Sequence, residues 1–379
     1  MRRWGWILAI VFAALAGTAN AQWEMESSGT TADLRGIDNV GGGVAWASGT
    51  NGTVLRTEDG GYLWQACAVP PGAEHLDFRG VQAFDANTAI VMSSGKGDLS
   101  RLYKTTDGCQ TWRLVFTNPD ADGFWDAIVF KNPNANTEEL AQDAGELVGD
   151  PVKGRFVVYD HMGPDWPTNW TRECACHPQT PKAREGETAF AASNSSVLSF
   201  GRADFMLGSG GVHGSRVFFF HEQLAKGSRD EVYFVQDTSD VPIATGKESR
   251  GIFSLGMRDR QNIVAVGGDY LEPDDSAETA AWTDDGGKTW AAAETPPHGY
   301  RSAVAYDAAS KTWITVGPNG TDISTDDGKN WRAVRPDPAL HEAADADRDW
   351  NALSLPFVVG PHGRIGKLNA KALTMKEGK

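Results

Sequence analysis

An eight-residue motif recurs along this chain, and its repetition limits the possible folds more than any other feature. The motif reads TEDGGYLW at 57–64, TTDGCQTW at 105–112, TDDGGKTW at 283–290 and STDDGKNW at 324–331. These copies fit Ser/Thr-x-Asp-x-Gly-x-x-Trp, except that Cys109 replaces the glycine in the second, and a decayed copy spans 159–166. Self-similarity of this kind indicates a repeat architecture, in which each unit packs against its neighbours.

The chemistry of this octapeptide suits a hairpin turn. We expect its aspartate to accept hydrogen bonds from N–H groups of the turn and its glycine to adopt a positive φ. The tryptophan folds back and buries a large apolar area. The motif follows a third strand and precedes a fourth, on the face opposite the loops that enter each unit. We therefore predict a structural rather than a catalytic role for Asp59, Trp64, Asp107, Trp112, Asp285, Trp290, Asp326 and Trp331.

Strand-like segments rich in apolar residues open seven units of the chain. They are LRGIDNV at 34–40, FRGVQAF at 78–84, FWDAIVF at 124–130, TAFAASN at 188–194, SRGIFSL at 249–255, YRSAVAY at 300–306 and WNALSLP at 350–356. A second apolar run ending in a glycine turn follows each opening, and in most units a third run and the octapeptide come next. Four strands in each of seven units predict an all-β, seven-bladed propeller of four-stranded blades.

Ring closure can also be predicted from the two ends of the chain. The seventh unit ends near Leu368 with three strands, whereas the strand-like segment at 22–28 precedes the first unit. We expect this N-terminal strand to pair with the C-terminal blade and so to close the ring. Residues 22–379 would then form a single domain, with an insertion at about 221–248 between the fourth and fifth blades.

The first 21 residues have the features of a secretory signal peptide. Arg2 and Arg3 precede an apolar run at 7–16, and Ala19-Asn20-Ala21 fits the small-x-small cleavage pattern. Paired arginines also occur in twin-arginine signals, but the residues around this pair match that motif poorly. We expect cleavage after about Ala21 and a periplasmic or secreted protein. Later segments fall short of the roughly 20 apolar residues that a spanning helix needs.

Charge restricts the partners of the exported chain. Of 35 Lys and Arg, removal of Arg2 and Arg3 leaves 33 against 50 Asp and Glu, a net charge of −17. Such a chain repels the phosphate backbone of nucleic acids. We predict no nucleic-acid binding, no cofactor and a monomeric state.

Four cysteines in an exported chain permit disulfides. Cys67 and Cys109 lie at similar distances from two of the repeated tryptophans, on opposite sides, which predicts a bridge between adjacent repeats. Cys174 and Cys176 precede His177, so a metal site is one reading of this segment. A local bridge or free thiols is the favoured reading, because no fourth ligand has suitable spacing. We predict no metal site.

Four openings place an arginine at what we take to be equivalent positions, namely Arg35, Arg79, Arg250 and Arg301. In the other three units we align Trp125, Thr188 and Asn351 with them. Guanidinium groups gathered at the mouth of the channel would capture carboxylates in bidentate fashion, with Trp125 as an added platform. The alternative is structural: each arginine caps its blade or pairs with Asp38, Asp126, Asp150 or Asp269, and Trp125 packs within a blade.

The sequence resembles the photosystem II stability/assembly factor-like family of BNR (Asp-box, sialidase-like) propellers. The segments that carry the likeness are VAWASGTNGTVLRTEDGGYLW, LVGDPVKGRFVVYD, GIFSLGMRD and WITVGPNGTDISTDDGKNW, together with the arginine-bearing openings. The resemblance implies an exported seven-bladed propeller in which an arginine patch binds a partner. We carry that role only to the four arginines named above, and the family's photosynthetic client does not transfer.

Two functions follow as hypotheses. The first is a non-catalytic assembly or scaffold propeller that binds a protein or peptide at the arginine-bearing face. The alternative is a sialidase-like or other glycoside hydrolase at the same face. Hydrolysis requires two carboxylates, for which Asp150 and Asp269 are candidates because they occupy comparable turns. The RIP-type motif of sialidases is absent, and no Tyr/Glu pair stands out.

Overall fold

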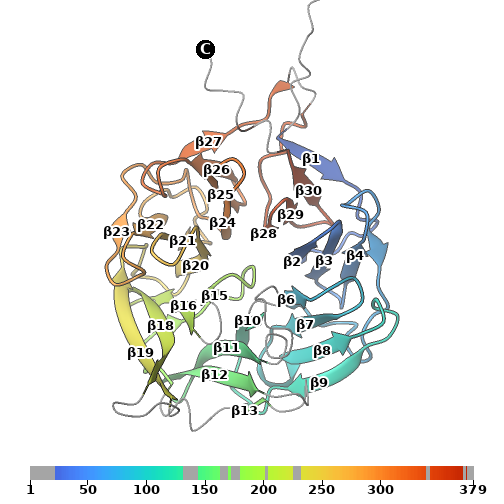
Figure 1. The fold of residues 1–379 in the computed structure, drawn as a ribbon, viewed down its shortest axis with the longest axis horizontal. Coiled ribbons are helices and arrows are strands. Elements are labelled where there is room, and N and C mark those ends of the chain that lie inside the picture. Colours follow the sequence, from blue (N-terminus) through green and yellow to red (C-terminus); the bar gives the residue numbers. More distant parts are fainter. Residues whose placement is uncertain are drawn as a thin grey trace, which may run out of the picture.

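The computed structural model describes residues 22–130, 144–162, 170–171, 180–200, 204–224, 232–338, 342–369 and 373. These residues form seven antiparallel sheets around a central axis, which confirms the predicted seven-bladed propeller (Figure 1). In each blade the first strand lies nearest the axis and the following strands are added outward, each hydrogen-bonded to the one before it.

Blades one to three are built from strands that follow one another in the chain. Blade one contains β2 (Leu34–Gly41), β3 (Val44–Gly49), β4 (Val54–Thr57) and β5 (Gln65–Ala66). Blade two contains β6 (Phe78–Ala83), β7 (Ala89–Ser93), β8 (Arg101–Thr105) and β9 (Arg113–Thr117), with the short 3-10 helix η1 (Gly97–Leu99) between β7 and β8. Blade three contains β10 (Trp125–Phe130), β11 (Ala144–Val152), β12 (Arg155–Met162) and β13 (Trp170–Thr171).

Blades four to six follow the same order. Blade four contains β15 (Val197–Phe200), β16 (Asp204–Gly208), β18 (Ser215–Leu224) and β19 (Val232–Val241). Blade five contains β20 (Arg250–Met257), β21 (Ile263–Asp269), β22 (Ala280–Thr283) and β23 (Ala291–Ala292). Blade six contains β24 (Ala303–Asp307), β25 (Thr312–Gly317), β26 (Gly320–Ser324) and β27 (Arg332–Val334).

Blade seven combines the two ends of the chain. Its inner strands are β28 (Ala352–Ser354), β29 (Phe357–Val359) and β30 (Ile365–Leu368). Its outer strand is β1 (Trp23–Glu26), which pairs antiparallel with β30 from Trp23 opposite Leu368 to Glu26 opposite Ile365. The ring is therefore closed by backbone hydrogen bonds between strands that are far apart in the sequence.

The fourth blade differs from the predicted one. Its innermost strand is β15, whereas Thr188 belongs to β14 (Glu187–Thr188), which pairs with β17 (Gly210–Gly211) beside blade five. The apolar residues that follow Thr188 are buried at the axis rather than in a blade. Residues 221–248, which the sequence predicts to be an insertion, contain the end of β18 and all of β19. These two strands form the outer hairpin of blade four.

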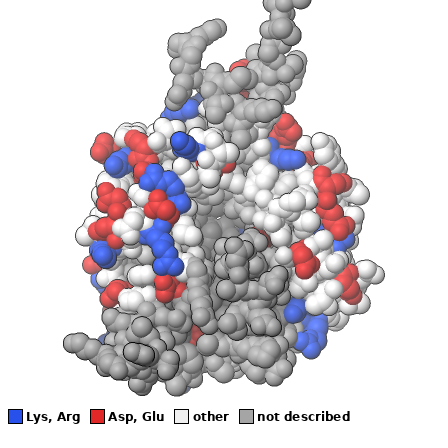
Figure 2. All heavy atoms as spheres, in the orientation of Figure 1, with Lys and Arg blue, Asp and Glu red and all other residues white. Residues whose placement is uncertain are grey.

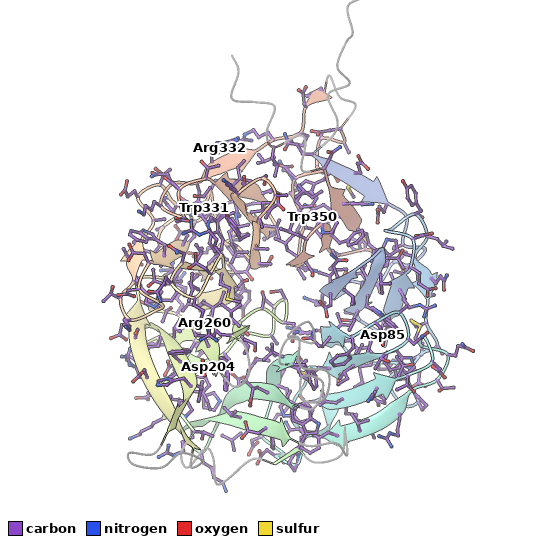
Figure 3. The ribbon with its side chains drawn as sticks, viewed as in Figure 1. Asp85, Asp204, Arg260, Trp331, Arg332 and Trp350 are labelled. Carbon is purple, nitrogen blue, oxygen red and sulfur yellow. A yellow bond between two sulfur atoms is a disulfide. The ribbon has the colours of Figure 1, made fainter. Side chains whose placement is uncertain are left out.

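Burial explains why the second strand of most blades is a nearly continuous apolar run. All described residues of β7, β21 and β25 are buried, because neighbouring blades cover both faces of each sheet. The outermost strands are more exposed, and acidic and basic side chains are interspersed around the disc (Figure 2). Figure 3 shows Trp350 close to the axis in blade seven, whereas Trp331 and Arg332 lie toward the rim in blade six.

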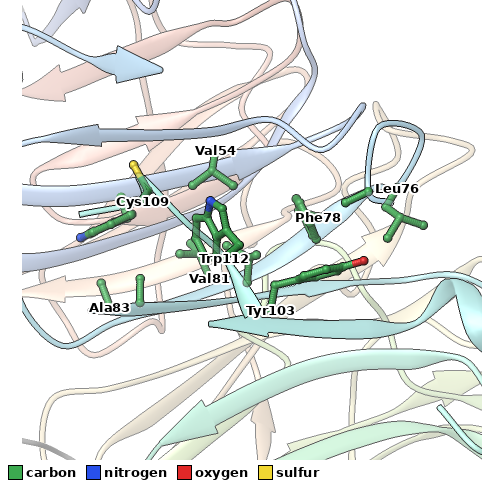
Figure 4. Close-up of a cluster of buried hydrophobic side chains, with 12 residues drawn as sticks. Val54, Leu76, Phe78, Val81, Ala83, Tyr103, Cys109 and Trp112 are labelled. Atoms are coloured by element: carbon green, nitrogen blue, oxygen red, sulfur yellow. The ribbon is translucent and has the colours of Figure 1, made fainter. Parts of the chain in front are cut away.

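The core consists of separate apolar clusters between neighbouring blades. The cluster between blades one and two contains Val54, Phe78, Val81, Tyr103 and Trp112 (Figure 4). Each adjacent pair of blades shares a cluster of this kind, including the closing pair, where Leu34 of blade one packs with Phe357 of blade seven. Stability therefore depends on the closed ring, since each blade completes the core of the next.

The four octapeptides form the same hydrogen-bond network. In the first, Thr57 Oγ1 donates to Asp59 Oδ1 at 2.9 Å, and the Leu63 N–H donates to that oxygen at 3.0 Å. The Gly61 N–H donates to Thr57 Oγ1 at 3.0 Å. Equivalent bonds recur around Asp107, Asp285 and Asp326. Each motif joins the third and fourth strands of its blade, so these aspartates hold turns, as the pattern predicts.

A disulfide joins Cys67, which follows β5, to Cys109 in the octapeptide of blade two. Cys109 occupies the glycine position of the motif with a φ of 63°, a left-handed conformation that favours glycine. Cys174, Cys176 and His177 lie outside the described residues. Among the residues described, no group of three or more His, Cys, Asp or Glu is arranged to hold a metal. In that part of the chain, helices are too short and polar to cross a bilayer.

Candidate functional site: the channel pocket

A pocket of about 750 Å³ opens on the channel at the face where the chain enters the innermost strands. We call it the channel pocket. Its lining comes from six of the blades and from the segment between blades three and four. Some walls are apolar and a few charged groups converge on the interior, which is the usual composition of a binding site.

Irregular strand pairing determines which side chains face this pocket. The pairing of β2 with β3 skips Arg35, that of β6 with β7 skips Arg79, and that of β10 with β11 skips Asp126. A bulge leaves one residue unpaired and redirects its side chain. In blade five the skipped residue is Phe253, and in blades six and seven Ser302 and Asn351 directly precede the first paired residue. The six ring residues that line the pocket are thus Arg35, Arg79, Asp126, Phe253, Ser302 and Asn351.

Two of the ring residues make one side of the pocket cationic. Two hydrogen bonds hold the Arg79 guanidinium in place. Its Nε donates to Asp77 Oδ2 at 2.8 Å, and its Nη1 donates to the Ala191 carbonyl at 3.1 Å. Arg35 lies on the other side of Asp77, with 3.5 Å between its Nε and Asp77 Oδ1. The Arg35 guanidinium also lies 4.0 Å from Asp33, measured from Nη2 to Oδ2, but it makes no hydrogen bond to a described residue. Its N–H groups can therefore donate to an anionic ligand.

An aromatic cluster forms another wall. The rings of Phe190 and Phe253 are stacked with 4.0 Å between their centroids, and Phe253 meets Tyr300 edge to face at 4.7 Å. Phe190 comes from residues 188–194, the segment predicted to be a strand of blade four. Hydrogen bonds at both ends hold this segment at the axis. Thr188 Oγ1 donates to Asp150, and the Asn194 side chain accepts from the Ile128 N–H and donates to the Ile128 carbonyl.

Carboxylates make the remaining side acidic. Asp126 is 1% exposed, and burial, followed by the nearby charge of Asp150, raises its pKa well above the usual range, while Arg79 opposes this shift. Burial also raises the pKa of Asp150, although hydrogen bonds from Thr188 and the Ala189 N–H favour its ionised form. Both carboxyls line the channel pocket.

Two of the four predicted binding arginines do not reach the pocket. Arg301 is fully buried and pairs with Asp322, its Nε donating to Oδ2 at 2.9 Å. Arg250 forms an ion pair with Asp269, with 3.0 Å between Nε and Oδ2, and further ion pairs with Glu272 and Asp275. The prediction that all four arginines share one mouth is therefore wrong for these two. The structural alternative named Asp269 as a partner, which holds for Arg250, whereas the partner of Arg301 is Asp322, which was not among the predicted carboxylates.

The sequence alignment also placed Trp125 at the mouth of the channel, and this prediction is wrong. Trp125 is fully buried, and its ring stacks on Phe116 at 5.2 Å between centroids and meets Tyr159 edge to face. The residue of β10 that lines the pocket is the next one, Asp126. Trp125 is therefore a packing residue and not a ligand platform.

The carboxylate pair proposed for hydrolysis is separated by the fold. Asp150 lines the channel pocket and Asp269 does not. Although burial opposes ionisation of Asp269, hydrogen bonds from Ser249, Arg250 and Lys247 hold its pKa well below the usual range. Burial raises the pKa of Tyr300, which disfavours it as a nucleophile. The two candidates thus do not form an acid and nucleophile pair at one site.

A local signal in the sequence identifies the ring residues that the alignment of arginines missed. The residue after each ring residue is small: Gly36, Gly80, Ala127, Ser254, Ala303 and Ala352 follow the six ring residues. Space explains this, because a Cβ added to Gly36 would lie 2.6 Å from Ser48 Oγ and 3.2 Å from the Arg79 carbonyl. Aligning the openings on this small residue, rather than on arginine, selects Asp126, Phe253 and Ser302.

Comparison with known proteins identifies structural relatives only. No family model matches the chain, and no curated protein matches its sequence. A solved structure of YCF48 bound to D1 peptide aligns with a TM-score of 0.57 and 16% identity, covering 94% of this chain and 99% of that one. YCF48 from Cyanidioschyzon merolae aligns with a TM-score of 0.54 and 19% identity, covering 93% of this chain and all of that one. At these identities the likeness shows a shared fold with YCF48, a photosystem II assembly factor.

Proposed function

We propose that this chain is an exported, non-catalytic propeller that binds a protein or peptide partner in the channel pocket and serves in assembly or scaffolding. The main support for the proposal is Arg35, a partly exposed guanidinium that lines the pocket, has ion-pair contacts with Asp33 and Asp77, and makes no hydrogen bond to any described residue. Guanidinium groups bind carboxylates strongly when they are partly desolvated. Arg79 adds a second cation, and the fold is one in which a related propeller binds a peptide.

The proposed surface is suited to a chain segment rather than to a large flat partner. A pocket of about 750 Å³ falls within the roughly 300–1,000 Å³ typical of ligand sites. Its aromatic cluster gives apolar contact area and its arginines give orientation. A few side chains of a partner would fill such a pocket, while the surrounding loops contact the rest of it.

The test is affinity capture from the periplasmic fraction of the native host. The immobilised chain is compared with the Arg35→Glu/Arg79→Glu double variant, and bound proteins are quantified by mass spectrometry. We expect a reproducible partner on the unchanged chain and at least a tenfold loss on the double variant. Arg332→Glu is the matched control, because Arg332 is exposed on the outermost strand β27 (Figure 3). Equal capture by the double variant would contradict the proposed site.

A catalytic role makes a different prediction. Under the non-catalytic proposal, the purified chain hydrolyses no glycoside in a broad chromogenic panel. Hydrolysis that disappears in an Asp150→Asn variant would replace the proposed function with a glycosidase at the same pocket.

A further inference from the structure

Asp126 is a buried acid without an assigned role. It lies at the bulge of β10, is 1% exposed and lines the channel pocket. Its Oδ2 atom is buried and has no hydrogen-bond partner among the described residues. An unpaired buried polar atom destabilises the fold, and more strongly when it is charged. Such groups are rare in folded proteins, so each needs an explanation.

The neighbours of Asp126 do not supply the missing partner. Arg79 directs its Nε to Asp77 and its Nη1 to the Ala191 carbonyl. Asp150 uses Oδ1 to accept from Thr188 and the Ala189 N–H, and as a second acid it cannot stabilise an ionised Asp126. Asp150 instead raises the pKa of Asp126. The local environment therefore favours a cation or a hydrogen-bond donor between the two carboxyls.

Two further acids line the pocket, the exposed Glu248 and the buried Glu187, and Glu187 is already neutralised. Glu187 is 5% exposed and accepts from Arg216 Nε at 2.8 Å, from Ser209 Oγ at 2.7 Å and from the Arg184 N–H at 2.7 Å. Glu187 thus has an internal partner where Asp126 has none. The charges left for a ligand are Arg35 and Arg79 on blades one and two, the Asp126–Asp150 pair on blade three, and the exposed Glu248 before blade five.

We propose that the channel pocket binds a dipolar peptide segment, with a carboxylate held by Arg35 and Arg79 and a lysine or arginine side chain held by Asp126 and Asp150. This inference rests on the proposed function and adds the chemistry of the partner. Arg35, Arg79 and Asp126 occupy the same position on three successive blades, so the acidic and basic groups of the ligand lie near each other in its sequence. A purely acidic segment is disfavoured, because its second carboxylate would meet the two aspartates.

Binding of a cation at Asp126 also releases a proton. The raised pKa of Asp126 means that the empty pocket keeps this carboxyl protonated at a pH where an ordinary aspartate is ionised, and a bound cation favours the ionised form. Affinity for a lysine-bearing segment should therefore rise with pH through the pKa of Asp126. The charged or titratable groups that face Asp126 are Arg79 on β6 and Asp150 on β11, with Arg35, Glu187, Glu248, Tyr270 and Tyr300 elsewhere in the pocket.

The test uses isothermal titration calorimetry with synthetic peptides whose ends are acetylated and amidated. One series carries a glutamate and a lysine separated by zero to three glycines, and a matched series replaces lysine by norleucine. We expect at least one spacing at which lysine improves affinity tenfold or more over norleucine. Asp126→Asn should remove this preference and the pH dependence, whereas Asp98→Asn, an exposed acid outside the pocket, should keep both.

The possible outcomes distinguish the inference from the proposed function. The dipolar site is wrong if the lysine and norleucine peptides bind with equal affinity. It is also wrong if Asp126→Asn weakens the binding of both peptide series equally. In either case a simple anion site remains. If no peptide binds at millimolar concentration, the dipolar site is also wrong, while affinity capture decides the proposed function independently. Thermal unfolding of Asp126→Asn, followed by circular dichroism, verifies that the variant is folded.

Discussion

Arg301 and Asp322 form an ion pair inside blade six, with 2.9 Å between Arg301 Nε and Asp322 Oδ2 and both side chains almost fully excluded from solvent. His298 Nδ1 also contacts Asp322 Oδ1, at 2.9 Å. Removing one member of a buried pair leaves the other charge uncompensated. We predict that Arg301→Ala lowers the free energy of unfolding by about 3–5 kcal/mol, measured by urea denaturation. An effect below about 0.5 kcal/mol, the usual range for a surface change such as Arg332→Ala, would show that the pair is not buried.

The disulfide between Cys67 and Cys109 offers a second test of stability. It closes a loop of 42 residues, for which the chain-entropy model gives about 4 kcal/mol. We predict that Cys67→Ser/Cys109→Ser loses stability of this order in urea denaturation. Cys67→Ser/Cys109→Gly should be less destabilised, because glycine restores the octapeptide pattern and tolerates the φ of 63°. If the serine variant were the more stable of the two, the turn conformation assigned to residue 109 would be incorrect.

The octapeptides predict a defined dependence of stability on pH. Burial opposes ionisation of Asp285, but hydrogen bonds from Thr289 and Thr283 lower its pKa to about 2. A carboxyl whose pKa is lower in the folded state stabilises the fold above its unfolded pKa of about 3.9, and this stability is lost as the pH falls toward 2. Asp285→Asn should therefore flatten the stability profile between about pH 4 and pH 2. Asp284 is the neighbouring, exposed acid, and Asp284→Asn should keep the steeper stability profile of the unchanged chain. Identical profiles for the two variants would contradict the hydrogen bonds assigned to Asp285.

Residues of the octapeptide show why the fold was predictable. Asp59 and Trp64 have side chains that satisfy a turn and fill an interface between blades, so their spacing reports the repeat directly. The site was less predictable because one inserted residue at a bulge changes which side chain faces the channel. Trp125 and Asp126 are adjacent, yet only Asp126, at the bulge, lines the pocket. The position of Phe190 could not be predicted either, because an apolar segment at the axis has the same composition as a buried strand.

The reactivity of individual arginines shows whether the partner covers Arg35 in the channel pocket. The chain is treated with phenylglyoxal, alone and with its captured partner, and modification at each arginine is followed by mass spectrometry. We predict that Arg35 reacts readily in the free chain and is protected at least fivefold by the partner, while fully buried Arg301 reacts slowly in both states. Arg301 reacting as fast as Arg35, or Arg35 remaining equally reactive in the complex, would contradict the channel pocket as the binding site.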